Sequence, residues 1–331
     1  MHQIGRVIKS NPLVLVSVIF LIGKSYDTLR IYNDMYKTLY VIGNGFDKFH
    51  ELETGYDDFK SWLAVEDVDL YKILCSIYSE DAKWWNNLER NMGIMDVRRF
   101  VDENYEYIPN EHECIPGLPP TLHSDYCARI YDKALQTLIL RFKEWINIVQ
   151  QKQVVAMPEL FNDTNRDESV CLTFNYTSLL ENAYGFDKKQ VKHIHGCVES
   201  GEPLILGHDR PYHSQEYAYT NVFGNQLSAF SEISEMLQAV GRYSKRHYEN
   251  FLNVKPFDEL WTSIKSVIVM GFSFSEIDSP YISYIKNHIH KDAEWKISWF
   301  SEDDKIQVCK VMSKYSIESY TFFKLDQILQ K

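Results

Sequence analysis

Short apolar runs that alternate with helical patterns are the feature of this sequence that most constrains its fold. The runs occupy residues 38–42, 169–174, 191–195, 204–206, 266–270 and 296–300, and helical patterns such as 226–242 and 277–290 separate several of them. Strands that are apolar along their whole length are buried on both faces, and their alternation with helices is typical of a parallel sheet covered on both sides. The sequence therefore predicts an α/β fold with a mostly parallel sheet.

A long region of helical character separates the first two runs. Apolar residues recur mostly at three- and four-residue steps from position 56 to about 104, and in 4-3-4-3-4 steps from Tyr131 to Val149. Residues 109–120 hold four of the ten prolines, which indicates a loop. We therefore predict a helical module over about 56–155, inserted into one α/β domain of residues 35–331.

The first 34 residues form an apolar extension to this predicted domain. Arg6 and Lys9 precede the apolar run PLVLVSVIFLIG at 12–23, which resembles the start of a signal peptide or an anchor. The run is shorter than the roughly 20 residues that a helix needs to span a bilayer. Three interpretations stay open: sequence upstream of a true start at Met35, a membrane anchor, or an ordinary buried segment.

Charge and cysteine content exclude several classes of function. The formal net charge is −11, so we expect no bulk binding of nucleic acid and no general attraction to anionic membranes. The six cysteines contain no C-x-x-C pair, which excludes a dense disulfide framework and a recognisable zinc site of four cysteines. We predict a cytoplasmic protein without a metal cofactor, with membrane association confined to the anchor interpretation of residues 12–23.

The residues after each predicted strand are candidates for a ligand site, because open parallel sheets bind ligands at the carboxyl ends of their strands. The first strand is followed by Gly43-Asn44-Gly45-Phe46-Asp47. A Gly-x-Gly turn lets backbone N–H groups approach a phosphate closely. The third glycine of the dinucleotide fingerprint is replaced by Lys48, and a tight turn without any ligand explains the glycines equally well.

Two polar side chains follow the next strands. Asn175 can donate and accept hydrogen bonds, which suits sugar hydroxyls or an attacking water, and the alternative is a cap of the next helix. His195, beside Gly196, suits a general base near neutral pH or a satisfied polar residue at the sheet rim. A metal pair of His195 with His193 lacks a third ligand at a recognisable spacing. His208 is a further histidine candidate.

The strand at 266–270 is followed by a loop of glycine, hydroxyl and carboxylate residues. Its sequence from Gly271 is GFSFSEID, which includes Ser273 and ends at Asp278. These residue types suit the recognition of a ribose or a phosphate, although Ser275 or Asp278 can equally cap the following helix. We expect the predicted fold to bring this loop and the three preceding strand ends to one rim.

Taken in order, these segments resemble the AbiH family of bacterial phage abortive infection proteins. The resemblance covers about residues 36–300 and rests on IGNGFD at 42–47, Trp85 with Leu88 and Glu89, TFNY at 173–176, His195 with Gly196, and GFS at 271–273 with Asp278 and Tyr281. AbiH proteins are in turn similar to sirtuin-like domains. This similarity implies a Rossmann-like sheet with an NAD pocket.

The resemblance also implies a role for each motif. The cofactor-binding residues would be Gly43, Asn44, Gly45, Asp47, Gly271, Ser273 and Asp278. Of these, Gly43 and Gly45 would contact the pyrophosphate. Asn175 would hold the nicotinamide ribose or the attacking water, and His195 would be the base. Thr177 stands where the sirtuin pattern has an aspartate, and the sirtuin zinc cysteines are missing. These departures speak against a protein deacylase and leave NAD hydrolysis or nucleotide binding.

We therefore expect an abortive infection protein that binds NAD or a related nucleotide, with NAD glycohydrolase as the enzyme activity to test. The alternative is a non-enzymatic nucleotide sensor that acts through a protein partner or self-association. A nuclease is the third possibility, and the net charge of −11 disfavours it. Glu89, Glu276 and Asp278 are candidates to stabilise positive charge on the sugar, and the sequence does not choose among them.

Overall fold

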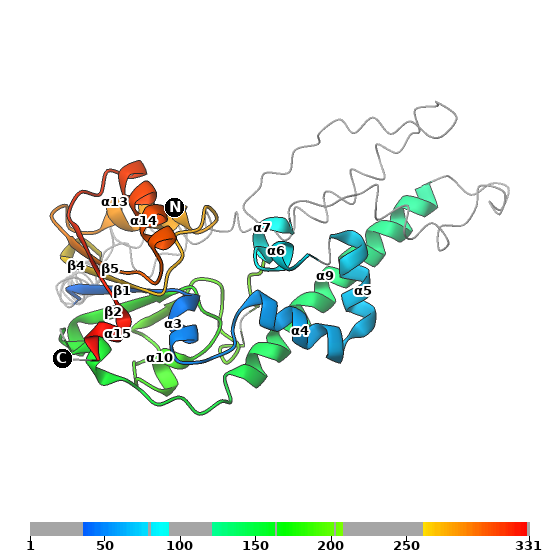
Figure 1. Ribbon diagram of the computed structural model, residues 1–331, viewed down its shortest axis with the longest axis horizontal. Coiled ribbons are helices and arrows are strands. Elements are labelled where there is room, and N and C mark those ends of the chain that lie inside the picture. Colours follow the sequence, from blue (N-terminus) through cyan, green and yellow to red (C-terminus); the bar gives the residue numbers. More distant parts are fainter. Residues whose placement is uncertain are drawn as a thin grey trace, which may run out of the picture.

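A computed structural model describes residues 36–78, 81–92, 121–162, 164–201, 203–207 and 261–329, with side chains at all of these except 77, 82 and 121–131 (Figure 1). The predictions for residues 1–34, the loop at 109–120, His208 and the helix at 226–242 lie outside the described residues.

A parallel sheet forms the centre of the described fold. Its strands are β1 (Thr38–Ile42), β2 (Ser169–Thr173), β3 (Val191–His193), β4 (Ser266–Met270), β5 (Glu294–Ser298) and β6 (Tyr320–Phe323). Their order is β3-β2-β1-β4-β5-β6, and every neighbouring pair is parallel. The predicted α/β class with a parallel sheet is confirmed. This is the strand order of doubly wound dinucleotide-binding folds, in which the order reverses beside the first strand.

Several details of the sheet differ from the sequence prediction, and two of them are that β2 ends at Thr173 rather than at residue 174 and β3 at His193 rather than at residue 195. The fifth strand lies at 294–298 rather than 296–300, and the strand at 320–323 was not predicted because its residues are only partly buried at the sheet edge. Residues 204–206 form no strand. The Ile205 N–H instead donates to the His195 carbonyl at 2.8 Å, which holds this segment beside the third strand end.

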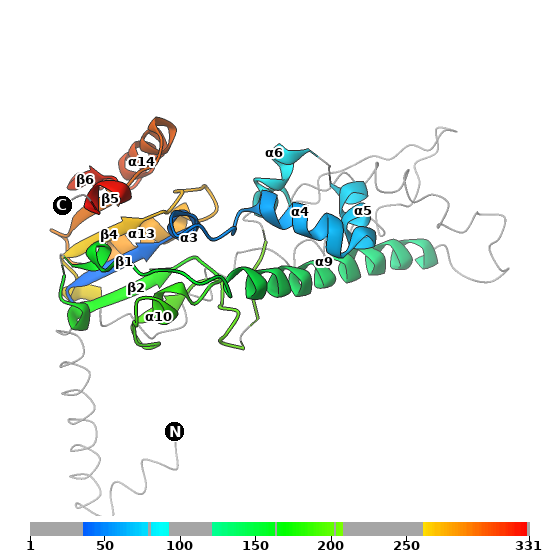
Figure 2. The same ribbon diagram turned by 60° about the horizontal axis from the view of Figure 1, so that its bottom comes forward.

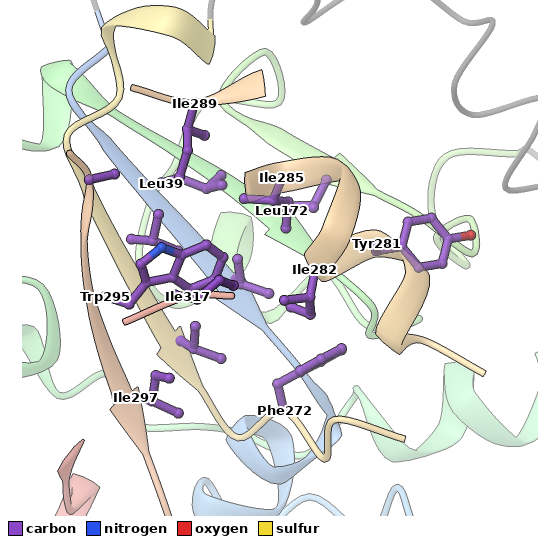
Figure 3. Close-up of a cluster of buried hydrophobic side chains, with 14 of the residues drawn as sticks. Leu39, Leu172, Phe272, Tyr281, Ile282, Ile285, Ile289, Trp295, Ile297 and Ile317 are labelled. Atoms are coloured by element: carbon purple, nitrogen blue, oxygen red, sulfur yellow. The ribbon is translucent and has the colours of Figure 1, made fainter. Parts of the chain in front are cut away.

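Helices cover both faces of the sheet. Successive strand residues point to opposite sides, so strands that are apolar along most of their length present an apolar surface on each face. On one face, Leu39 and Leu172 pack with Ile282 and Ile285 of α13 (Ser279–His288), as Figure 3 shows. Helix α14 (Glu302–Lys314) packs on this face too, and it begins with a capping box between Ser301 and Asp304.

The opposite face is covered by shorter elements. Tyr40, Ile42 and Met270 of the strands share a core cluster with Phe46. The elements on this face are α3 (Asn44–Phe49), α10 (Leu179–Asn182), η2 (Pro158–Phe161) and α15 (Leu325–Ile328). The sheet is therefore buried between two layers, as the apolar character of its strands predicts.

A group of helices lies between β1 and β2 in the sequence. They are α4 (Tyr56–Glu66), α5 (Val68–Ile77), α6 (Ala82–Trp85), α7 (Leu88–Asn91) and α9 (Thr121–Val149). Two short 3-10 helices lie outside this group: η3 (Arg166–Glu168) directly precedes β2, and η5 (Trp261–Ser263) precedes β4. Figures 1 and 2 show these five helices beyond the carboxyl ends of β1 and β2. That they form a separate inserted module stays a prediction.

The apolar stripe predicted on the last of these helices forms their shared core. Leu135, Leu138 and Phe142 of α9 are buried together with Phe59 of α4 and Trp85 of α6. None of the helices in the described ranges is both long and apolar enough to cross a membrane.

Candidate functional site

The register of the sheet aligns the ends of four neighbouring strands, β3, β2, β1 and β4. Ile42 pairs with Thr173 on one side and with Met270 on the other, and Thr173 pairs with His193. The residues that follow these positions therefore lie along one edge of the sheet. The strand order reverses between β1 and β4 at this edge, where ligands bind in folds of this type.

The glycine turns after β1 and β4 pack directly against each other. A Cβ atom on Gly43 would lie 2.6 Å from the Gly271 carbonyl oxygen, and one on Gly45 would lie 2.8 Å from the same atom. Gly271 has φ +63°, and its Cβ would lie 2.1 Å from Phe46 N. The Gly45 N–H donates to the Gly271 carbonyl at 2.8 Å. Contact between the two turns thus explains all three glycines, so they are not by themselves a sign of a phosphate.

Asp47 is a buried carboxyl group that joins two strand ends. Its side chain accepts hydrogen bonds of 2.7 Å from Asn175 Nδ2 and 2.7 Å from Thr177 Oγ1, and the residue is 1% exposed. Burial raises the pKa of Asp47 to about 6, against the lowering effect of these two hydrogen bonds and of the charge on His193. The group therefore titrates close to the physiological range.

The side chain of Asn175 has one satisfied and one unsatisfied end. Nδ2 donates to Asp47, whereas Oδ1 is buried and has no hydrogen-bond partner among the described residues. The residue is 5% exposed, and the N-cap of α10 is Ser178, so Asn175 is not the cap of that helix. A buried amide oxygen without a donor is costly unless something supplies one.

His195 is buried in an aromatic environment rather than exposed at the rim. Its ring centroid lies 5.5 Å from that of Phe174, 6.1 Å from that of Tyr176 and 6.2 Å from that of Tyr281. Its Nε2 atom lies 3.9 Å from Asp278 Oδ1. Phe174 and Tyr176 flank Asn175 in the sequence, so the two predicted catalytic residues belong to adjoining segments of the same edge.

The structure separates the three acidic candidates. The Tyr176 hydroxyl lies 3.0 Å from Glu89 Oε1, which brings a carboxylate of α7 to the strand edge. Burial and the charges of Glu89 and Asp278 raise the pKa of Tyr176 well above 10, so both carboxylates lie close enough to the Tyr176 hydroxyl to influence it electrostatically. Glu276 instead pairs with Arg90 at 3.4 Å, and its side chain is 72% exposed. Glu89 and Asp278 are therefore the acidic groups next to His195 and Tyr176.

Two further predicted residues lie at the outside of this edge. Asn44 Nδ2 donates to the Thr54 carbonyl oxygen and Asn44 Oδ1 accepts from the Thr54 hydroxyl, which ties the first turn to the segment just before α4. Ser273 is exposed in the loop after β4. In the same loop Phe274 is buried at φ 53°, a left-handed conformation that is strained for a phenylalanine. Such strain is concentrated at functional sites.

His193 does not form a pair with His195. Its Nδ1 lies 3.0 Å from the Asn175 carbonyl oxygen, and its Nε2 lies 2.9 Å from Glu181 Oε1. Across the described residues, no three side chains of histidine, cysteine, aspartate or glutamate gather as a metal site would require. Sequence reasoning did not single out Tyr176, Glu181 or Cys197, because their roles depend on contacts across the sheet edge.

The chain matches a model of a known protein family. The family described as bacteriophage abortive infection AbiH matches residues 39–299, which is well over half of the chain. The family predicted from the sequence motifs is confirmed, and this match supports a role in abortive infection. No curated protein matches the chain. The similarity to sirtuin-like domains stays a prediction.

Proposed function

The chain belongs to the AbiH family of bacteriophage abortive infection proteins, and from this membership we propose that it defends its host by binding and hydrolysing NAD at the carboxyl edge of the sheet. The family supports the defence role. The ligand and the reaction are inferences from the side chains at the edge.

The observation that carries the proposal is the buried oxygen of Asn175, which has no hydrogen-bond partner within the described part of the chain. With Asp47 ionised, the amide NH₂ must face the carboxylate, so Oδ1 points away as a fixed acceptor. A ribose hydroxyl or a bound water supplies the missing donor. An acceptor fixed in this way orients a sugar or a nucleophilic water better than a freely rotating amide does.

The proposed reaction breaks the bond between ribose C1′ and the nicotinamide nitrogen. The bonding electron pair leaves with nicotinamide, positive charge develops on the ribose, and water adds to C1′ while losing a proton. The products are nicotinamide, ADP-ribose and a proton. Carboxylates beside the ribose stabilise the developing charge, as in glycoside hydrolysis.

Residues at the carboxyl edge of the sheet supply the proton transfer and the charge stabilisation that this reaction needs. His195 takes the proton from water, and Asp278, 3.9 Å from its Nε2, stabilises the imidazolium that forms. Glu89 and Asp278 are the carboxylates for the ribose, since Glu276 is paired with Arg90. The two glycine turns pack against each other, so a pyrophosphate cannot lie between them. It would instead bind at the exposed outer side of the first turn, at Asn44 and Gly45.

Incubating the purified full chain with NAD and quantifying products by chromatography tests the reaction. We expect nicotinamide and ADP-ribose in equal amounts, with at least a hundredfold loss of rate in His195→Gln, since general bases contribute about 10²–10⁴-fold. Asp278→Asn should also be slow. The matched controls are His290→Gln and Asp292→Asn, a histidine and an aspartate that lie elsewhere on the surface.

The alternative function is a nucleotide sensor without catalysis, which acts through a protein partner or self-association. Calorimetry with NAD separates the two. Binding that is lost in Asn175→Ala but releases no nicotinamide favours the sensor. Neither binding nor release in the folded, unmodified chain would overturn both.

A further inference from the structure

A second group of reactive side chains lies next to the proposed site and has no part in its chemistry. It comprises Cys197, His193, Glu181 and Ser178, which we call the thiol cluster. His193 ends β3 and Cys197 follows four residues later, while Ser178 and Glu181 begin the segment of α10. Cys197 is buried and forms no disulfide.

The hydrogen-bond partners of His193 require a charged ring. Nδ1 faces the carbonyl oxygen of Asn175 at 3.0 Å, and Nε2 faces the Glu181 carboxylate at 2.9 Å. Both partners are acceptors, so both ring nitrogens must carry a proton. Burial lowers the pKa of His193, but hydrogen bonds and charges from Cys197 and Glu181 outweigh it and raise this pKa to about 10. His193 is thus a buried cation.

The surroundings of the Cys197 sulfur favour its thiolate form. The Ser178 hydroxyl lies 3.1 Å from Sγ, and either atom can donate this hydrogen bond. Burial raises the pKa of this thiol, but the interactions with His193, Ser178 and the backbone of Glu199 together lower it below its ordinary value. Hydrogen bonds and a nearby cation stabilise a thiolate, which is the nucleophilic form of cysteine.

A cavity borders the thiol cluster at Ser178. It has a volume of about 130 Å³, and Thr177, Ser178, Leu179 and Asn182 are among its lining residues. Ser178 therefore belongs both to the cavity wall and to the surroundings of the sulfur. Water needs roughly 10–15 Å³ of such space, so a molecule of the size of hydrogen peroxide fits.

We propose that Cys197 is a redox modification site at which hydrogen peroxide converts the thiolate to a sulfenic acid. The sulfur attacks one peroxide oxygen, the S–O bond forms as the O–O bond breaks, and hydroxide leaves and takes a proton from solvent. Sulfur loses two electrons and peroxide gains them. A thiol reductant reverses the change through a mixed disulfide.

The chain connects this modification to the proposed site. The Ile194 N–H donates to the Thr173 carbonyl at 2.9 Å, and the Val198 N–H donates to the Tyr176 carbonyl at 3.0 Å. Cys197 therefore lies in a segment that is bonded along the residues around Asn175, with His195 two positions before it. An added oxygen in this packed segment displaces its neighbours.

Two other described cysteines, Cys171 and Cys309, are internal controls. Cys171 is also buried, but burial and the charge of Glu181 raise its pKa well above 9. Cys309 is exposed. Accessibility alone would thus favour oxidation of Cys309, whereas thiolate stabilisation favours Cys197.

The test treats the full chain with equimolar hydrogen peroxide at pH 7, traps sulfenic acid with dimedone and quantifies each cysteine peptide by mass spectrometry. We expect labelling of Cys197 at least tenfold faster than that of Cys309, and its loss when dithiothreitol precedes dimedone. His193→Gln should slow the labelling of Cys197 at least tenfold without changing that of Cys309. Preferential labelling of Cys309 in the unmodified chain would overturn the proposal.

A second measurement keeps the proposal testable if His193→Gln does not fold. In the unmodified chain, labelling of Cys197 should fall less between pH 8 and pH 6 than labelling of glutathione measured alongside, because free cysteine thiols have a pKa of about 8.5. An equal fall for both thiols would refute thiolate stabilisation. Neither measurement depends on NAD, so failure here is separate from failure of the proposed function.

Discussion

The side-chain amide of Asn175 donates a 2.7 Å hydrogen bond to Asp47 Oδ1, although the two residues stand 128 positions apart. One follows β1 and the other follows β2, so this bond fastens neighbouring strand ends. The ionised carboxylate also decides which end of the amide faces away from it. The charge on Asp47 therefore controls the acceptor that the proposed ligand would meet.

The first prediction concerns Asp47 and pH. Its pKa is raised from 3.8 to about 6, so its contribution to stability is fully present below pH 3.8 and is lost as pH rises through 6. The shift corresponds to about 3 kcal/mol at pH 7. Asp47→Asn removes this cost, because its oxygen can accept from Asn175 and its NH₂ can donate to Thr177. We expect the variant to be more stable than the unmodified chain by about 1–3 kcal/mol at pH 8.

Urea unfolding of both proteins between pH 4.5 and pH 8 measures this difference. It should shrink as pH falls below 6. A constant difference across the range would show that Asp47 does not titrate as expected.

The second prediction concerns the partner of this carboxylate. Asn175→Ala leaves buried Asp47 with a single side-chain donor, Thr177. Loss of a hydrogen bond to a charged group costs about 1.5–3 kcal/mol. We expect this loss in the free energy of unfolding at pH 8 and a smaller one at pH 5, where Asp47 is largely protonated.

Asn182→Ala is the matched control, since its amide donates to Glu199 at the exposed surface. It should change stability by less than about 0.5 kcal/mol. Equal effects of the two variants at pH 8 would contradict the role given to Asn175.

The third prediction compares two glycines with positive φ. Gly271 has φ +63° and would place a Cβ 2.1 Å from Phe46 N, whereas Gly201 has φ +74° and nothing within 4 Å. Gly201→Ala meets only the backbone penalty of about 1–2 kcal/mol. Gly271→Ala adds a clash with backbone that cannot move aside, so we expect a loss above 4 kcal/mol or failure to fold. Similar unfolding midpoints for the two variants would rule out the close contact of the turns.

The fourth prediction concerns His193. Its folded-state pKa is about 10 against 6.5 for an ordinary histidine, so its pairing with Glu181 stabilises the fold fully below pH 6.5 and is lost as pH rises through 10. Glu181→Gln removes the charged partner. The stability difference from the unmodified chain should therefore decline between pH 7 and pH 10, as chemical denaturation at each pH can establish. A difference that stays constant between pH 7 and pH 10 would mean that His193 is already neutral in this range.

Sequence alone was sufficient for the elements whose signal is local. The runs at 38–42 and 266–270 are apolar after their first residue, and both are strands with these bounds. The stripe through Leu135, Leu138 and Phe142 also needs only its own spacing to predict a buried helix face. The partly buried strand Tyr320–Phe323 lacks such a signal, because an edge strand has fewer neighbours to exclude water.

The site required information that no local pattern holds. The sequence could not choose between Glu89 and Glu276, since the choice depends on Arg90 pairing with one of them and Tyr176 with the other. Asp47 was predicted to bind a cofactor, but its bond to Asn175 becomes visible only when β1 and β2 are paired. The same holds for the thiol cluster, whose members come from both sides of β3.

The contact between Gly43 and Gly271 also has a consequence for synthesis of the chain. The two glycines are 228 residues apart, and they meet only when β4 takes its place beside β1. Pairing over such a separation is slow, and it must wait until the later strand has left the ribosome. Asp278 emerges later still. A growing chain therefore carries no assembled edge until translation has passed Asp278, so any activity of that edge cannot begin before β4 and the loop after it have been synthesised.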